Sequence, residues 1–154
     1  MKNIFLTLLS PIIRRHEDCI GFLLARFGRH QIELWCCPTG YEIPEHCHPC
    51  ETIELFFLYG HDVLFSKRDL RLCDEQKVKV SFPRDIFKHF TIKGSEAHYF
   101  KVPKGRGKWL VFINWEKWID GCRPSSASED FVYTPKGKEE LKCREEEDKV
   151  HHLI

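Results

Sequence analysis

The sequence predicts an all-β protein: a barrel or sandwich of antiparallel strands, preceded by one helix and followed by a short helix or tail. Three observations support this fold class. Short apolar runs alternate with turn residues from residue 30 onward. Residues 11–27 instead repeat their apolar side chains at helical spacing. The composition, with 42% hydrophobic and 13% aromatic residues, is typical of a packed globular chain.

The first segment, residues 1–29, is predicted to contain an amphipathic helix over about 11–27. Ser10 is a favourable N-cap, and Pro11 suits the first helical turn. Gly28 is suited to end the helix. The residues with helical spacing are Ile12, Ile13, His16, Cys19, Ile20, Leu23, Leu24 and Phe27.

The second segment, residues 30–120, is predicted to form the β-barrel. Turn residues rich in glycine, proline and aspartate separate its apolar runs. The predicted strands are 31–37, 42–48, 53–59, 62–66, 78–82, 89–92, 98–102 and 109–114. Many short strands at this spacing favour a closed or two-layered antiparallel sheet.

The third segment, residues 121–154, is predicted to be an extension that packs on the barrel or trails from it. A short strand-like run lies at 131–133. Residues 136–149 are heavily charged and helix-prone around 139–147, which favours a surface helix or a frayed tail.

Size and charge restrict the classes of partner. A chain of 154 residues is long enough for one domain with its own core. Its 24 basic and 23 acidic residues give a net charge of +1, so we expect no nucleic-acid partner. No apolar run approaches the roughly 18 residues of a membrane span, so we expect no membrane partner.

The eight cysteines lack the dense regular spacing of a secreted disulfide scaffold. The apolar run in the first ten residues is not followed by the small-residue cleavage site of a secretory signal. We therefore expect reduced, mostly buried thiols in a cytoplasmic protein.

Two closely spaced histidines are the first candidate functional residues. Residues 40–48 have the sequence Gly-Tyr-Glu-Ile-Pro-Glu-His-Cys-His, which places His46 and His48 two positions apart. Residues i and i+2 of a strand share one face about 7 Å apart. On a concave face, two such imidazoles can bind the same metal ion.

This segment resembles the first motif of the cupin superfamily: Gly, five residues, His-x-His, three or four residues, Glu, six residues, Gly. Gly40, His46, His48 and Gly60 match it, whereas the carboxylate is displaced. Glu54 stands one position late, and Glu51 stands two positions early.

A second, weaker likeness lies downstream. The second cupin motif has a proline and, five residues later, a histidine; here Pro83 and His89 are six apart. The resemblance covers about residues 30–115 and implies a double-stranded β-helix, or jelly-roll, barrel.

The resemblance also implies a metal centre at the mouth of the barrel. His46, His48 and His89 would be ligands, and Glu54 would be the fourth ligand or the general base. Such a donor set suits a divalent transition metal (Fe, Mn, Ni, Cu or Zn) without distinguishing among them. Open coordination positions would serve a small-molecule substrate in oxygenase, isomerase or lyase chemistry. A homodimer is expected as well, because such barrels often bury a sheet edge against a second copy.

The orientation of Glu54 stays open in the sequence. If Ile53, Leu55 and Phe57 face the core, Glu54 points to water. If Phe56 and Leu58 face inward, Glu54 does too, and a buried carboxylate then needs a cation or a donor.

Two alternative functions use other readings of the same region. The first is a non-catalytic barrel that binds a small ligand or a protein. The second is a structural zinc-thiolate site built from Cys36, Cys37, Cys47 and Cys50. His98 is interpreted as a structural histidine, with entry into the cavity from a later strand as the alternative.

Overall fold

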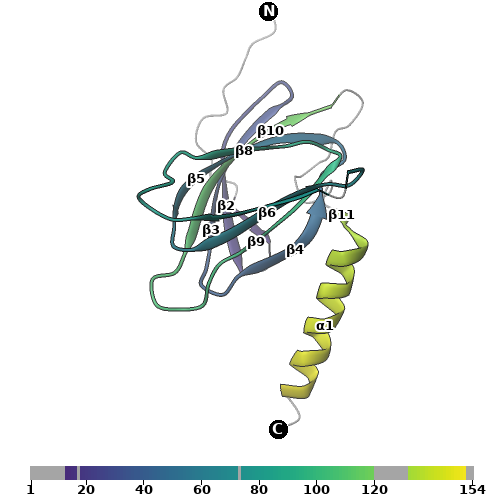
Figure 1. Ribbon diagram of the computed structural model, residues 1–154. Coiled ribbons are helices and arrows are strands. Elements are labelled where there is room, and N and C mark those ends of the chain that lie inside the picture. The colour runs from purple at the N-terminus through teal and green to yellow at the C-terminus, as the bar shows by residue number, and fades with distance from the viewer. Residues whose placement is uncertain (1–12, 17, 73, 120–131, 152–154) are drawn as a thin grey trace, which may run out of the picture.

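Two antiparallel sheets face each other across the core in a computed structural model of the chain, and one helix extends beyond them (Figure 1). The structure describes residues 13–16, 18–72, 74–119 and 132–151. The six-stranded sheet contains, in spatial order, β1 (Ile13–His16), β2 (Cys19–Phe27), β3 (His30–Cys37), β10 (Leu110–Trp118), β5 (Glu51–Gly60) and β8 (His89–Ile92). The five-stranded sheet contains β11 (Val132–Tyr133), β4 (Glu42–Cys47), β9 (Glu96–Lys101), β6 (Val63–Asp69) and β7 (Glu75–Val80). The helix α1 spans Pro135–His151.

The core lies between the sheets and is built mainly by alternation of inward and outward residues, which is clearest on β5. On β5, the inward residues Ile53, Leu55 and Phe57 are buried, while the residues between them are partly exposed. Side chains on the inner face of one sheet thus meet those of the other, as in other two-layered antiparallel folds. Nine apolar residues enclose a cavity of about 10 Å³: Leu55, Phe57, Val63, Phe65, Val80, Phe90, Phe100, Leu110 and Phe112. The part of the interior that these residues line is therefore apolar, and the cavity left in it is very small.

The predicted N-terminal helix is wrong: residues 13–16 and 19–27 form β1 and β2. The pairing of β2 with β3 shifts register between Leu23 and Ala25. That irregularity, together with apolar residues on both faces of the strand, produces a spacing that imitates a helix. Gly28 has φ +56° and makes the β2–β3 turn. Residues 11, 12 and 17 of the predicted helix lie outside the described residues.

Most predicted strands of the barrel are confirmed, with shifted ends. The largest shifts are at the predicted strands 78–82 and 109–114, which correspond to β7 (Glu75–Val80) and β10 (Leu110–Trp118). The predicted C-terminal helix is also confirmed. Thr134 caps α1, because its Oγ1 accepts a hydrogen bond from the Gly137 N–H at 3.2 Å, and Pro135 occupies the first helical position.

The cysteines correct a further expectation. Cys19 and Cys37 form a disulfide across β2 and β3, with Cα atoms 4.5 Å apart, the spacing of a non-hydrogen-bonded strand pair. Cys50 is also disulfide-bonded. In the part of the chain that the structure describes, the free thiols are those of Cys36, Cys47 and Cys143. The expectation of reduced thiols is therefore wrong for Cys19, Cys37 and Cys50.

Among the described residues, no helix has both the length and the apolar character that a membrane crossing requires.

Candidate metal centre

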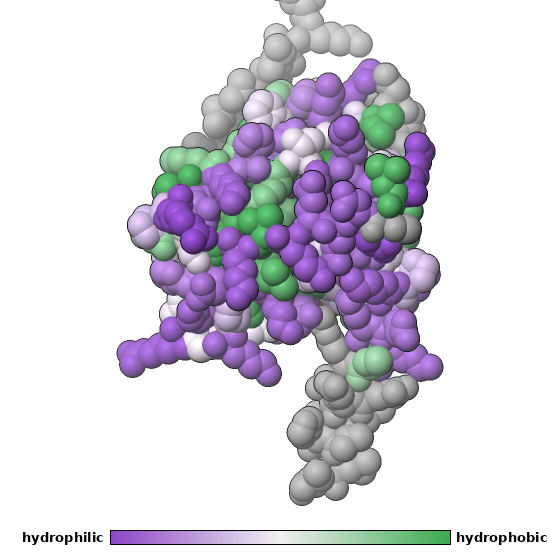
Figure 2. Space-filling model, in the orientation of Figure 1, coloured by the Kyte–Doolittle hydropathy of each residue, from purple (hydrophilic) through white to green (hydrophobic). Residues whose placement is uncertain are grey.

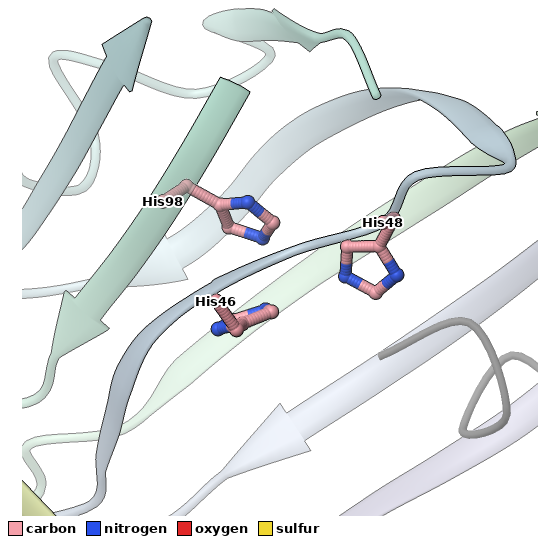
Figure 3. Close-up of side chains that lie close together, drawn as sticks. All are labelled: His46, His48 and His98. Atoms are coloured by element: carbon pink, nitrogen blue, oxygen red, sulfur yellow. The ribbon is translucent and has the colours of Figure 1, made fainter. Parts of the chain in front are cut away.

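Three buried histidines gather between the sheets at one end of the barrel (Figure 3). His46 lies on β4, His48 directly follows this strand, and His98 lies on β9. Their side chains each offer one nitrogen, and these nitrogens all lie within 4.8 Å of one another. The exposed fractions are only 2%, 8% and 4%, respectively. The three rings therefore share one site that is shielded from bulk water.

Strand pairing explains why these residues meet. β4 and β9 are antiparallel neighbours, and His46 stands directly opposite His98. Side chains of directly opposed residues lie on the same face, with Cβ atoms about 4.5–5.5 Å apart. His48 returns to that face because it lies two positions beyond His46. The centroids of the His46 and His98 rings are 4.2 Å apart.

The protonation states of two of these rings favour metal binding. Burial lowers the pKa of His98 well below its ordinary value, and the neighbouring His48 lowers it further, so the ring is neutral at pH 7. The Nδ1 atom of His46 lies 2.8 Å from the Pro44 carbonyl oxygen. Since a carbonyl only accepts, Nδ1 carries the proton and Nε2 carries the lone pair. Histidines that bind a metal through one ring nitrogen typically donate the N–H of the other nitrogen to a carbonyl or carboxylate oxygen in this way.

The carboxylate beside the histidines is that of Glu51. Its side chain is buried at the start of β5, with Oε2 3.9 Å from Nδ1 of His48. Its Oε1 accepts a hydrogen bond from the Trp118 indole N–H at 3.0 Å. Glu51 occupies the inward face of β5 together with Ile53, which brings it into the interior.

Glu54 does not join the cluster. Because Ile53, Leu55 and Phe57 face the core, Glu54 lies on the outer face of β5, where it accepts a hydrogen bond from Thr91 Oγ1 at 2.8 Å. The alternative in which Glu54 points to water is thus the one found.

His89 is also placed elsewhere. It is exposed on β8, opposite Phe56, and the two rings stack with centroids 5.7 Å apart. The third imidazole of the cluster is His98 instead. The signal that points to His98 is the alternation along the predicted strand 98–102, since Phe100 and Val102 are buried on the same face.

Comparison with known proteins identifies the architecture. No protein-family model and no curated relative matches the chain. Among solved structures, the capsular polysaccharide assembling protein CapF from Staphylococcus aureus matches with a TM-score of 0.62 and 14% identity, over 80% of this chain and 34% of that one. Oxalate decarboxylase from Lactobacillus farciminis, in complex with formate, matches with a TM-score of 0.60 and 10% identity, over 80% of this chain and 34% of that one. The barrel is a cupin fold.

A third match is a CENP-C domain from Drosophila melanogaster, with a TM-score of 0.57 and 6% identity, over 70% of this chain and 72% of that domain. The chain spans about a third of the length of the CapF and oxalate decarboxylase chains that it matches. At these identities, the likeness establishes the cupin fold, and the activities named in these matches belong to those proteins.

A second buried polar group lines the same end of the cupin barrel and was not predicted. Gln31 Nε2 donates to Glu33 at 2.6 Å and to Glu116 at 3.1 Å, and all three residues are buried. Arg26 Nε donates to the side-chain amide oxygen of Gln31 at 2.9 Å, and its guanidinium carbon lies 5.2 Å from the centre of the Trp118 ring, whose N–H binds Glu51. The interior is thus polar at the histidine end and apolar at the other.

The C-terminal segment contacts β4, the strand that carries His46. β11 pairs with β4, and Tyr133 stands opposite His46. Beside it, the buried Glu45 accepts hydrogen bonds from Arg68 Nη2 at 2.6 Å and Thr134 Oγ1 at 2.7 Å. Burial alone would raise the pKa of Glu45, but its partners, led by the Arg68 and Thr134 hydrogen bonds, outweigh burial and lower it. A charged carboxylate therefore joins β4, β6 and the start of α1.

The zinc-thiolate alternative is not assembled. Cys37 and Cys50 are in disulfides, which removes them as thiolate ligands. The Cys47 thiol contacts the Val132 carbonyl oxygen at 3.6 Å, on the side of β4 toward β11.

Proposed function

We propose that this cupin is a metal-dependent enzyme that acts on a small molecule, with His46, His48 and His98 as ligands of a divalent transition metal. One observation carries the proposal: three buried imidazoles from two strands and a loop present their nitrogens to a common point, all within 4.8 Å of one another. This set replaces the one expected from sequence, in which His89 and Glu54 took the places now given to His98 and Glu51.

The donor set fits such an ion. A metal–nitrogen bond of about 2.0–2.1 Å requires ligand nitrogens about 3.0–3.4 Å apart, a distance that small side-chain rotations reach from the observed arrangement. The Nδ1 atom of His98 is buried and has no hydrogen-bond partner within the described ranges. Imidazoles with one carboxylate suit Fe, Mn, Ni, Cu or Zn, whereas Ca²⁺ and Mg²⁺ prefer oxygen ligands.

The residues around the site support chemistry at a bound substrate. When bound, the metal supplies a Lewis acid that polarises a substrate oxygen. The Trp118 N–H fixes one oxygen of Glu51, so the other oxygen is oriented toward His48. From that position, Glu51 serves as the fourth ligand or as the base that takes a proton from the substrate. The low exposure of the histidines keeps bulk water from this reaction.

Metal analysis with matched variants tests the proposal. Purified protein is loaded with Mn²⁺, Fe²⁺ or Zn²⁺, desalted and measured by elemental mass spectrometry. We expect about one ion per chain, lost in His46→Ala and in His98→Ala. The exposed His89→Ala is the control and retains the ion.

Two outcomes would contradict the assignment. Metal-free protein with an unchanged circular dichroism spectrum would favour the non-catalytic binding module. Loss of metal in His89→Ala, with retention in His98→Ala, would restore the ligand set expected from sequence.

A further inference from the structure

The barrel end opposite the histidines carries exposed apolar side chains among basic residues, and we propose that it docks on a membrane surface that contains anionic lipid. We call this surface the aromatic–basic end. Its apolar residues are Phe82, Ile86, Phe87 and Trp109, all exposed. Its basic residues are Lys79, Arg84, Lys88, Lys104, Arg106 and Lys108. The inference is independent of the metal centre.

These residues come together because three connections meet at the Gly60 end of β5. They are the β5–β6 turn, the β7–β8 connection and the β9–β10 connection. The Phe82 N–H donates to the Gly60 carbonyl oxygen at 2.7 Å, which joins the β7–β8 connection to the β5–β6 turn. Leu110, next to Trp109, pairs with the same Gly60. In Figure 1 these connections lie on the side of the barrel away from β11 and α1. Figure 2 shows hydrophobic residues beside strongly hydrophilic ones on that side.

The β7–β8 connection is held rigidly. Asp85 accepts hydrogen bonds from the Ser81 N–H at 2.8 Å and from Arg84 Nη2 at 2.7 Å. The Phe87 N–H donates to the Phe57 carbonyl oxygen at 2.8 Å. The backbone hydrogen bonds therefore fix the segment that carries the exposed Ile86 and Phe87.

Phe87 combines high exposure with an uncommon backbone conformation. Its side chain is 67% exposed, and its φ is +62°, a left-handed conformation that is uncommon for a bulky residue. Packing in the core does not account for an aromatic side chain held at the tip of a strained turn. Strained, exposed positions of this kind are characteristic of binding surfaces.

Charge identifies the kind of surface. Segments 60–62, 79–88 and 103–109 together contain six basic and two acidic residues. Their net charge is therefore +4, whereas the net charge of the whole chain is +1. Anionic lipid headgroups attract basic side chains. Each Lys or Arg that lies near the membrane surface strengthens the binding of a protein to the membrane by about fivefold. Trp109 adds a side chain that favours the membrane interface.

The shape favours lipid over a protein partner. A protein would need pockets matched to each protruding side chain over roughly 800 Å² of surface. A bilayer accepts protruding apolar side chains without a complementary shape. The expectation of no membrane partner rested on the lack of a spanning segment, which does not apply to a surface-bound protein.

Vesicle co-sedimentation tests the proposal with the full chain. Vesicles contain phosphatidylcholine alone or with about 30% phosphatidylserine. We expect binding to the anionic vesicles at least about tenfold stronger than to neutral ones, and its loss in about 0.5 M salt. Ile86→Ser with Phe87→Asn should weaken binding by about tenfold or more, since asparagine tolerates a positive φ. Lys104→Gln with Arg106→Gln should weaken it by about 25-fold.

Leu72→Ser is the matched control. Leu72 is 73% exposed, but it lies in the β6–β7 turn, at the opposite end of β7. We expect unchanged binding for this variant, and circular dichroism verifies the fold of every variant. Absence of binding to anionic vesicles, or equal effects of the Leu72 and Ile86/Phe87 changes, would overturn the proposal. Binding to soluble polyglutamate with the same variant pattern would replace the membrane with an acidic protein.

Discussion

Glu51 and Glu54, three positions apart on one strand, face opposite sides of the sheet. Glu51 contacts His48 and Trp118 in the interior, whereas Glu54 is bound to Thr91 outside. We expect Glu51→Gln to weaken metal binding by about 10–100-fold, because it removes the carboxylate charge beside the ligands. Chelator competition titrations measure the affinity. Glu54→Gln is the isosteric control with an affinity change below about twofold, and equal losses in the two variants would contradict the assignment of Glu51.

Trp118 is the residue that orients Glu51. Trp118→Phe keeps an aromatic ring beside Arg26 but removes the N–H donor, so we expect metal affinity to fall by about tenfold. A visible absorption spectrum of the Co²⁺-loaded protein should change with it. Trp115→Phe is the control: this indole, on the exposed face of the same strand, donates to His30 at 3.1 Å. An unaltered Co²⁺ spectrum in Trp118→Phe would show that the hydrogen bond does not tune the site.

His46 and His48 could be found from sequence, because their common face depends only on a spacing of two residues in extended chain. His98 could not be assigned in the same way, since its place beside His46 depends on the register between β4 and β9. The side of the sheet taken by Glu51 likewise depends on which β5 residues pack against the opposite sheet. Local patterns thus predicted two of the three clustered histidines, and non-local pairing decided the places of His98 and Glu51.

Among the elements, the connection between β4, β6 and α1 depends on the buried Glu45. Arg68→Met removes its main charged partner and leaves the buried carboxylate with only the Thr134 hydroxyl and Lys136, 3.8 Å away, which should destabilise the fold by about 3 kcal/mol. Urea unfolding measures the change. Lys101→Met is the control, because Lys101 binds Glu42 at 3.0 Å in an exposed pair worth less than about 1 kcal/mol. Similar midpoints for the two variants would refute a structural role for the Glu45 network.

The β7–β8 connection should respond to acid. The Arg84 hydrogen bond, aided by the Ser81 N–H, lowers the pKa of Asp85 from 3.8 to about 2. The lowered folded-state pKa means that this group stabilises the fold above about pH 4 and loses that effect as pH falls through about 2. Melting temperatures measured from pH 5 to pH 2 should therefore fall less steeply in Asp85→Asn than in the native chain. Parallel curves would contradict the prediction.

Strands were easier to predict than the helix that proved absent. On β5, buried and partly exposed residues alternate from Glu51 to Leu58, which identifies a strand directly. On β2, the irregular pairing near Leu23 places apolar residues on both faces, and the spacing then matches a helix equally well. Gly21 distinguishes the two, because any Cβ there would lie 2.9 Å from the Trp35 ring, but that contact exists only once β2 and β3 are paired.

At the scale of the whole molecule, the cupin barrel separates two kinds of chemistry along its strands. The histidines and the buried Glu51 lie at one end, and the apolar cavity and the aromatic–basic end lie at the other. β5 runs from Glu51 at the first end to Gly60 at the second, and β10 runs back beside it from Leu110 to Trp118. Changes at one end are therefore expected to leave the other intact, which allows the two proposals to be tested separately in the same chain.

Gly137 lies so close to β4 that a Cβ atom there would come within 2.0 Å of the Glu45 carbonyl oxygen. The first turn of α1 is thus seated directly on the backbone next to His46, although the rest of the helix projects into solvent (Figure 1). A chain shortened to end at residue 131 would strip this cover from the histidine strand and take Thr134 from Glu45. A shortened chain should therefore retain the first turn of α1, so that the strand that carries His46 keeps its contacts with the C-terminal segment.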